Sequence, residues 1–229
     1  MIVRSTESQL IARHGQTSVI TTIVTDNQGL LTDYPIEFVA NLGQVVTPTA
    51  ITDDSGVATT TLEIDSTAIR TINHATYPLT VTAKSGMITG TVSLTLVAIP
   101  CDDIEEKNDG PSPDTGMVEV NTACIGSLQD DEPNNSPLGD DDYYRLDLTS
   151  PGTILVTLRG IPQGANYDLQ LLKFDDNPPI NLGSARQGNA DENLQLSGAQ
   201  AGVYYIRVFL RQKASEPNQN TYILALVVE

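Results

Sequence analysis

Residues 53–64 read Asp53-Asp54-Ser55-Gly56-Val57-Ala58-Thr59-Thr60-Thr61-Leu62-Glu63-Ile64, and this stretch indicates the fold class of the chain. Its first four residues are of the types that build tight turns. Ala58, Thr60, Leu62 and Ile64 then occupy alternate positions. That period is typical of a β-strand with one buried face.

The same alternation recurs across residues 1–99. The predicted inward rows are Ile20, Thr22 and Val24; Ile36, Phe38 and Ala40; Leu79, Val81 and Ala83; and Ile88, Gly90, Val92, Leu94 and Leu96. Turn-forming clusters separate these rows. Short strands that each have one apolar face must pack as two sheets face to face. We therefore predict a β-sandwich over residues 1–99.

A second series of alternating strands begins at Tyr143. The expected strands contain Tyr144, Leu146 and Leu148; Ile154, Val156 and Leu158; Asp168 to Phe174; Leu194 and Leu196; Val203 to Leu210; and Tyr222 to Val228. This series predicts a second sandwich of jelly-roll type over residues 100–229. The expected fold class is all-β, with two β-sandwich domains in tandem, and no stretch shows the apolar period of a sustained helix.

The first domain resembles a known family in three stretches: residues 24–29 (Val-Thr-Asp-Asn-Gln-Gly), 34–38 (Tyr-Pro-Ile-Glu-Phe) and 52–59 (Thr-Asp-Asp-Ser-Gly-Val-Ala-Thr). They are similar to the bacterial Ig-like repeats of invasin and intimin type. The resemblance covers about residues 8–97. It implies an Ig-like spacer of cell-surface and secreted proteins, sometimes adhesive, without chemistry of its own.

The second domain resembles the bacterial pre-peptidase C-terminal domain. The matching stretches are residues 140–148 (Asp-Asp-Asp-Tyr-Tyr-Arg-Leu-Asp-Leu), 165–171 (Ala-Asn-Tyr-Asp-Leu-Gln-Leu) and 201–208 (Ala-Gly-Val-Tyr-Tyr-Ile-Arg-Val). Upstream, residues 105–109 resemble the opening motif of that family, with Lys107 where the family usually has Pro. The resemblance spans about residues 102–229.

Acidic residues concentrate between the two predicted domains. Of 29 Asp and Glu residues, 13 lie between residues 100 and 142, together with Lys107 alone. Carboxylates this dense repel one another, so the segment is either disordered, bound to a hard cation, or an acidic surface kept for solubility. Cys101 and Cys124, the two cysteines of the chain, flank part of it. We expect them to form a disulfide, with two free thiols as the alternative.

The pre-peptidase resemblance implies a calcium site. Collagen-binding members of that family bind calcium through the opening acidic motif and the Asp-x-Asp before the Tyr strand. The corresponding residues here are Glu106, Asn108, Asp109, Asp140 and Asp142. Their oxygen atoms suit calcium, and Asp140 and Asp142 lie on one side of an extended strand. The alternative is a solvated acidic loop without metal.

Composition and motifs exclude several functions. The pI near 4.2 disfavours nucleic acid, and no run approaches the roughly 20 apolar residues of a membrane span. His14 and His74 are the only histidines, and no H-E-x-x-H or G-x-S-x-G motif is present. We therefore expect no enzymatic activity, no nucleic-acid partner and no membrane insertion, and we expect a monomer.

Three functions remain open, all extracellular or at the cell surface. The first is a non-catalytic spacer segment of a larger bacterial protein, because the sequence is expected to begin and end within folded structure. The second is a binding module for collagen or a cell-wall polysaccharide, with Tyr204, Arg207 and Arg211 as the expected outward ligand face. The third is the C-terminal part of a secreted protease whose catalytic domain lies elsewhere.

Overall fold

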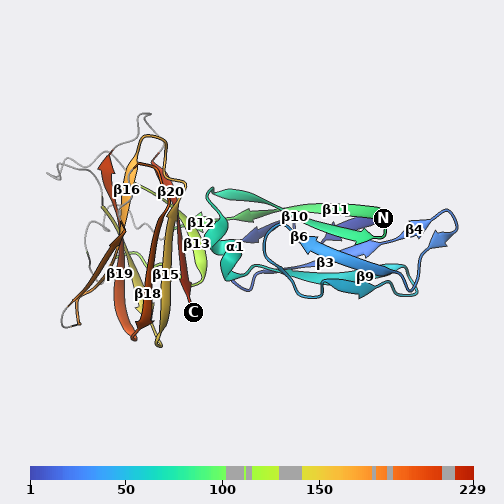
Figure 1. Ribbon diagram of the computed structural model, residues 1–229, viewed down its shortest axis with the longest axis horizontal. Helices are drawn as coiled ribbons and strands as arrows, with labels where there is room; N and C mark the ends of the chain where they lie inside the picture. Colours follow the sequence, from blue (N-terminus) through green and yellow to red (C-terminus); the bar gives the residue numbers. More distant parts are fainter. Residues whose placement is uncertain (102–110, 112–114, 129–140, 177–178, 185–187, 213–219) are drawn as a thin grey trace. The chain divides into compact units, whose positions relative to one another are not determined.

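The computed structural model describes residues 1–101, 111, 115–128, 141–176, 179–184, 188–212 and 220–229 (Figure 1). It forms two compact units. One comprises Met1–Thr71 and Thr76–Val97, and the other comprises Ile72–Ala75 and Ala98–Glu229. Nearly all regular structure in both is β, so the predicted fold class is confirmed. No helix in the described part of the chain is long and apolar enough to cross a bilayer.

The first domain is a sandwich of two sheets with immunoglobulin-type strand order. One sheet has the order β1 (Ile2–Ser5), β3 (Thr17–Ile23), β9 (Val57–Glu63) and β7 (Gln44–Val45). The other has the order β2 (Gln9–Ile11), β11 (Ile88–Val97), β10 (Thr76–Ser85), β6 (Pro35–Ala40) and β8 (Thr49–Ile51). The parallel pairing of β2 with β11 brings the two ends of this domain's chain together in one sheet. The Ig-like prediction is therefore confirmed.

The turn and strand at residues 53–64 form as their sequence predicts. The carboxylate of Asp53 accepts hydrogen bonds from the backbone N–H groups of Ser55 and Val57, at 2.8 and 2.9 Å. Gly56 has a φ of 66°, which glycine adopts without a Cβ penalty. In β9 the predicted inward row from Ala58 to Leu62 is buried. The first domain's core also includes Ile20 on the neighbouring strand β3, and Phe38, Leu79 and Leu96 in the other sheet.

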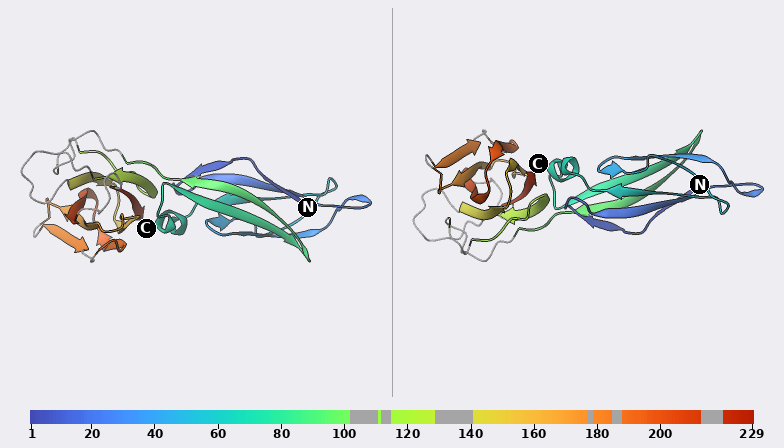
Figure 2. Two further views of the ribbon diagram at one scale, coloured as in Figure 1. Left: turned by 90° about the horizontal axis from the view of Figure 1, so that it is seen from above. Right: turned by 90° about the horizontal axis from the view of Figure 1, so that it is seen from below.

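One helix was not predicted. Helix α1 (Ser66–Thr71) is six residues long, which is too short to give a helical period in the sequence. Asp65 caps it by accepting a hydrogen bond from the N–H of Ala68 at 2.7 Å, and Ala68 and Ile69 are buried. Figure 2 shows α1 at the opposite end of the first domain from the small hairpin β4 (Thr25–Asp26) and β5 (Gly29–Leu30).

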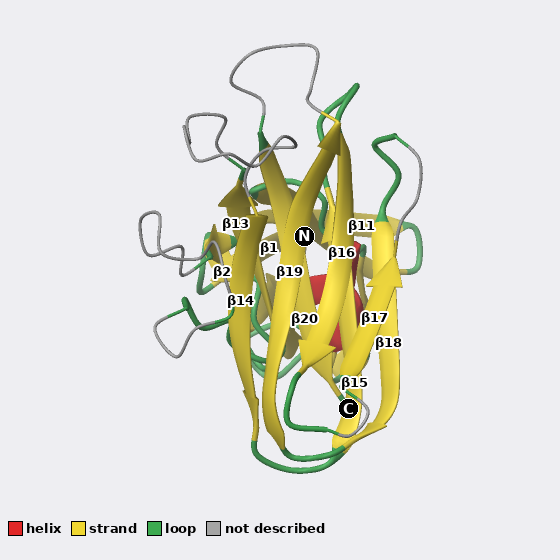
Figure 3. Ribbon diagram, turned by 90° about the vertical axis from the view of Figure 1, so that its left-hand side faces the viewer, coloured by secondary structure: helices red, strands yellow, loops and turns green. Residues whose placement is uncertain are grey.

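The second domain has the strand order of a jelly roll. One sheet contains β12 (Ile99–Pro100), β13 (Thr122–Ser127), β20 (Thr221–Val228), β15 (Gly152–Arg159) and β18 (Glu192–Ala199) in that order. The other, face-on in Figure 3, contains β14 (Asp141–Leu148), β19 (Gly202–Gln212), β16 (Asn166–Lys173) and β17 (Ile180–Ser184). From β13 to β20, consecutive strands alternate between the sheets except at β17, which confirms the jelly-roll prediction.

Alternating side chains of both sheets fill the interior of the second domain. Tyr144, Leu146 and Leu148 from β14 meet Ile154, Val156 and Leu158 from β15, and Tyr204, Ile206 and Val208 come from β19. All of these side chains are buried in one hydrophobic cluster. The same cluster contains Cys101 and Cys124, so the start of the domain is part of its core.

Candidate functional site

A disulfide closes the first segment of the second domain, as predicted. Cys101 follows β12, and Cys124 lies in β13, which pairs in parallel with β12. The N–H of Cys101 donates to the carbonyl of Ile125 at 2.8 Å, which extends that pairing by one residue. The two Cα atoms are 4.8 Å apart, and both cysteines are buried. The bond therefore ties residue 101 to the second strand of its own sheet.

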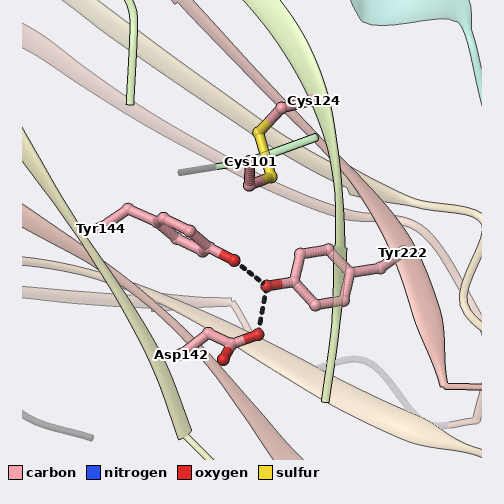
Figure 4. The surroundings of a disulfide bond; sticks show 5 residues. All are labelled: Cys101, Cys124, Asp142, Tyr144 and Tyr222. Atoms are coloured by element: carbon pink, nitrogen blue, oxygen red, sulfur yellow. Dashed lines mark hydrogen bonds between the residues drawn. A yellow bond between two sulfur atoms is a disulfide. The ribbon is translucent and has the colours of Figure 1, made fainter. Parts of the chain in front are cut away.

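Close to the disulfide, three polar side chains meet inside the core (Figure 4). The Tyr222 hydroxyl donates to Oδ2 of Asp142, and the hydroxyls of Tyr144 and Tyr222 are 2.5 Å apart. Since the proton of Tyr222 is directed to the carboxylate, Tyr144 donates to Tyr222. All three residues are at most 1% exposed. We call Asp142, Tyr144 and Tyr222 the buried polar triad.

The triad depends on a glycine in the neighbouring strand. Gly126 of β13 pairs directly with Tyr222 of β20, and a Cβ at residue 126 would lie 2.5 Å from Cζ of Tyr222. The Tyr222 ring therefore lies over the backbone at Gly126, and it meets Tyr167 edge-on with ring centroids 6.2 Å apart. Burial, and then the neighbouring Tyr144 and Asp142, raise the pKa of Tyr222 well above its usual value. Tyr222 therefore stays protonated and can donate to Asp142.

The outer face of the sheet β14–β19–β16–β17 carries a row of ion pairs. Arg207 pairs with Asp141 at 2.5 Å and donates to the side-chain oxygen of Gln170 at 3.0 Å. Arg211 pairs with Asp168 at 2.8 Å. The two guanidinium groups lie 4.3 and 4.7 Å from the ring centroid of Phe209. We call this cluster the arginine cluster, and it holds Phe209 between two cations that are each paired with a carboxylate.

The expected ligand face of Tyr204, Arg207 and Arg211 is wrong at Tyr204. Tyr204 is fully buried, and its hydroxyl donates to the carbonyl of Gln200 at 2.8 Å. It shares the inward row of β19 with Ile206 and Val208, because residues of equal parity in a strand face the same side. The outward member of the adjacent pair is Tyr205, which is half-buried. Arg207 and Arg211 do lie on the outer face, and their use in binding stays a prediction.

Of the five predicted calcium ligands, Asp142 alone belongs to the described residues. Glu106, Asn108, Asp109 and Asp140 lie outside them. Asp142 is buried, and its Oδ2 accepts the hydrogen bond of Tyr222. Within the described ranges, no three His, Cys, Asp or Glu side chains are grouped so that they could hold a metal ion. Calcium binding therefore stays a prediction that depends on the other four residues.

The sequence alone did not identify the carboxylates that pair with Arg207 and Arg211. Asp168 is almost fully buried, and Asp141 lies beside Phe209 in the register of β14 and β19. The alternation alone places Asp141 and Arg207 on outward positions, but their contact requires β14 to pair with β19. These two strands are about 60 residues apart in the chain, and nothing in the local sequence indicates that pairing.

Comparison with known families supports the assignment of the second domain. Residues 140–210 match the bacterial pre-peptidase C-terminal domain. The second domain therefore contains a domain of that family at residues 140–210, which confirms the resemblance seen in its motifs. No curated protein matches the chain in sequence.

Solved structures with related architecture include bacterial adhesins. A C-terminal fragment of intimin in complex with the intimin-binding domain of its translocated receptor is 13% identical, with a TM-score of 0.36 over 99% of this chain and 61% of that one. Invasin, a bacterial integrin-binding protein, is 15% identical, with a TM-score of 0.38 over 99% of this chain and 38% of that one.

A secreted serine protease, VesC from Vibrio cholerae, is another neighbour. It is 12% identical, with a TM-score of 0.30 over 99% of this chain and 50% of the protease. This chain thus spans between 38% and 61% of the length of these three proteins.

Proposed function

We propose that this chain is a non-catalytic accessory segment of a secreted or surface-anchored bacterial multidomain protein. The observation that carries the proposal is the buried Cys101–Cys124 disulfide in the same sandwich domain whose residues 140–210 match the bacterial pre-peptidase C-terminal domain. Disulfides form and persist outside the reducing cytoplasm. A disulfide in the core of this domain supports export of the chain to the cell surface or the medium.

The arrangement of charged groups supports an accessory role rather than catalysis. Among the described residues, two aspartates are buried, and each is held by a protein partner: Tyr222 for Asp142 and Arg211 for Asp168. His14 and His74 are both exposed. His14 lies between β2 and β3, and His74 lies between α1 and β10. A general base must lie within hydrogen-bond reach of the proton that it abstracts from a substrate, and in Asp142 and Asp168 a protein partner already occupies a carboxylate oxygen.

Fractionation of the producing cells, combined with activity assays, tests this proposal. Antibodies against the chain should label intact cells or the culture fluid, and mass spectrometry should find Cys101 linked to Cys124. The purified chain should leave casein, gelatin and chromogenic glycosides unchanged. Recovery only from the cytoplasm with both thiols reduced, or turnover of one of these substrates by the chain, would contradict the proposal.

A binding module for collagen or a cell-wall polysaccharide is the second candidate. It is favoured by the aromatic and arginine side chains that share the outer face of the sheet β14–β19–β16–β17. Sedimentation with insoluble collagen, chitin and peptidoglycan separates this candidate from a simple spacer. The binding module predicts retention on one of them, and the spacer predicts none.

The C-terminal part of a secreted protease is the third candidate, and the matched family favours it through its association with peptidases. Mass spectrometry of the protein isolated from its producing cells and then denatured separates this candidate from the other two. A peptidase parent predicts peptides of a catalytic domain linked to this chain or released from it by processing.

We further propose that Glu106, Asn108, Asp109, Asp140 and Asp142 bind calcium. Millimolar CaCl2 should then raise the melting temperature by several degrees, because a ligand that binds only the folded state stabilises it. Asp140→Ala should abolish the shift without removing a member of the buried polar triad. Asp175→Ala, an exposed aspartate on the second domain, is the matched control. A wild-type chain whose melting temperature does not change on addition of calcium would contradict the proposal that it binds calcium.

A further inference from the structure

The outer face of the sheet β14–β19–β16–β17 has two chemically different halves. Paired strands place their outward side chains in rows across the sheet. One row contains Asp141, Phe209 and Asp168, and the next contains Tyr143, Arg207 and Gln170. These two rows belong to the arginine cluster, in which the guanidinium groups are paired with carboxylates.

The other half of the face is hollow. The third row contains Arg145, Tyr205 and Leu172, and Val203, two residues from Tyr205, is the next outward residue of β19. Arg145, Phe174, Asp175, Val203 and Tyr205 line a shallow pocket of about 350 Å³. The rings of Phe174 and Tyr205 are 5.8 Å apart between centroids and tilted by 50°. Phe174 is 51% exposed, so this aromatic pair is open to solvent on the pocket side.

We propose that this pocket, lined by Tyr205, Phe174 and Arg145, binds a sugar unit of an uncharged polysaccharide. A pyranose ring has an apolar face of C–H groups and a rim of hydroxyls. Two neighbouring aromatic rings offer an apolar surface for the first, and charged planar groups offer hydrogen bonds for the second. The proposal rests on the binding-module function. It places the binding site in this pocket rather than in the arginine cluster.

The charged rim of the pocket is held in place before a ligand binds. Nε of Arg145 donates to Oδ1 of Asp147 at 2.7 Å, and Nη2 of Arg145 donates to Oδ2 of Asp147 at 3.2 Å. A two-point contact of this kind fixes the plane of the guanidinium group. Less side-chain entropy is then lost when a hydroxyl group binds at the rim.

The charge of the pocket decides between classes of polysaccharide. One cation, Arg145, stands beside two carboxylates, Asp147 and Asp175, and the whole chain has a net charge of −17. A sulfated or phosphorylated polymer would be repelled by this excess of negative charge. An uncharged chain carries no such penalty.

The position of the pocket disfavours an extended peptide. Peptides that add to a sheet need an edge strand with unpaired backbone groups. Tyr205 and Val203 belong to β19, whose two edges are already paired with β14 and β16. A ligand here must bind through side chains on the sheet face, as a flat sugar ring can. A triple-helical protein such as collagen is the competing occupant and is included in the test.

Sedimentation of the full chain with chitin, microcrystalline cellulose and fibrillar collagen tests the site. We expect retention on chitin or cellulose, and about tenfold weaker binding for Phe174→Ala and for Tyr205→Ala. Phe174→Tyr keeps the ring and should bind as the wild type does. Tyr34→Ala, an exposed tyrosine of the first domain, is the matched control that should not weaken binding. Unchanged melting temperatures show that the variants are folded.

The outcomes separate the site from the function. Wild-type retention that Phe174→Ala and Tyr205→Ala do not weaken would overturn this site and leave the binding module standing. Failure of the wild type to bind chitin, cellulose or collagen would overturn both the site and the binding-module function, and the spacer function would remain. Retention on collagen alone would assign the domain a protein partner and overturn the sugar proposal.

Discussion

At the scale of single residues, the buried polar triad places polar groups inside the core of the second domain. A buried carboxylate is tolerated only where hydrogen bonds replace its water. Asp142 has the hydroxyl of Tyr222 for this purpose, and Tyr222 in turn accepts from Tyr144. The triad joins β14 of one sheet to β20 of the other, so it fixes how the two sheets face each other.

Tyr222→Phe removes only one oxygen atom, but it should clearly destabilise the second domain. The substitution removes the hydroxyl that donates to Asp142 and accepts from Tyr144. Both groups then lose a hydrogen-bond partner inside the core, which costs about 1–3 kcal/mol. Thermal unfolding followed by circular dichroism should show a melting temperature lower by several degrees. Tyr205→Phe, on the half-buried outer face, is the control and should melt with the wild type. Equal melting of both variants would show that the triad does not stabilise the fold.

Alkaline pH should weaken the second domain through the same residue. The pKa of Tyr222 is raised in the folded state, chiefly by burial, so the folded protein holds this proton more tightly than the unfolded chain does. Its contribution to stability is complete below the unfolded pKa of about 10 and is lost as the pH rises from there through the folded pKa. Urea unfolding at pH 9 and at pH 11 measures this loss.

The loss with pH should be smaller in Tyr222→Phe than in the wild type. Tyr143, whose pKa is also raised by burial, contributes a part that remains in the variant. The difference between the two proteins therefore isolates Tyr222. Identical slopes of stability against pH would contradict a protonated, buried hydroxyl at this position.

At the scale of elements, strand β13 shows how a small residue makes room for the triad. Gly126→Ala should be strongly destabilising, since the new Cβ would lie 2.5 Å from the Tyr222 ring, whose hydroxyl is held by Asp142. Gly183→Ala in β17 is a matched control in the same domain, because its Cβ would meet only Gln170 at 3.9 Å.

Chemical unfolding measures the free-energy difference between these two glycine variants. We expect Gly126→Ala to lose about 1–3 kcal/mol, as overpacked cores do, and Gly183→Ala to stay near the wild type. A Gly126→Ala protein as stable as Gly183→Ala would mean that the Tyr222 ring is free to move away.

Most elements could be predicted from the sequence because their period is set locally. The rows from Ala58 to Leu62 and from Leu79 to Ala83 are buried as alternation predicts. Several short elements, such as α1 and β17, could not be found in this way. Helix α1 has fewer than two turns, and β17 has only five residues, next to the prolines at 178 and 179.

The face of a strand residue was harder to predict than the strand itself. In the pair Tyr204 and Tyr205, either residue could point outward until the inward row of Ile206 and Val208 is considered. Contacts such as Arg207 with Asp141 depend on which strands pair across the jelly roll. That pairing is a property of the whole domain, so local sequence does not determine it.

At the scale of the whole molecule, the two domains are stabilised differently. The first contains no cysteine, whereas the second contains both and links them in its core. Both family resemblances could be predicted from short motifs, because those motifs combine turn residues with alternating strands. The calcium ligands could be named only through the family motif, and four of the five lie outside the described residues.

Differential scanning calorimetry of the full chain, compared with a Cys101→Ser/Cys124→Ser variant, tests the central claim that the second domain is a separate sandwich stabilised by its disulfide. We predict two transitions for the wild type. Loss of a crosslink that closes a loop of this size costs roughly 3 kcal/mol, so one transition should fall by about 10 °C in the variant while the other stays in place. A single transition, or an equal shift of both, would contradict the account.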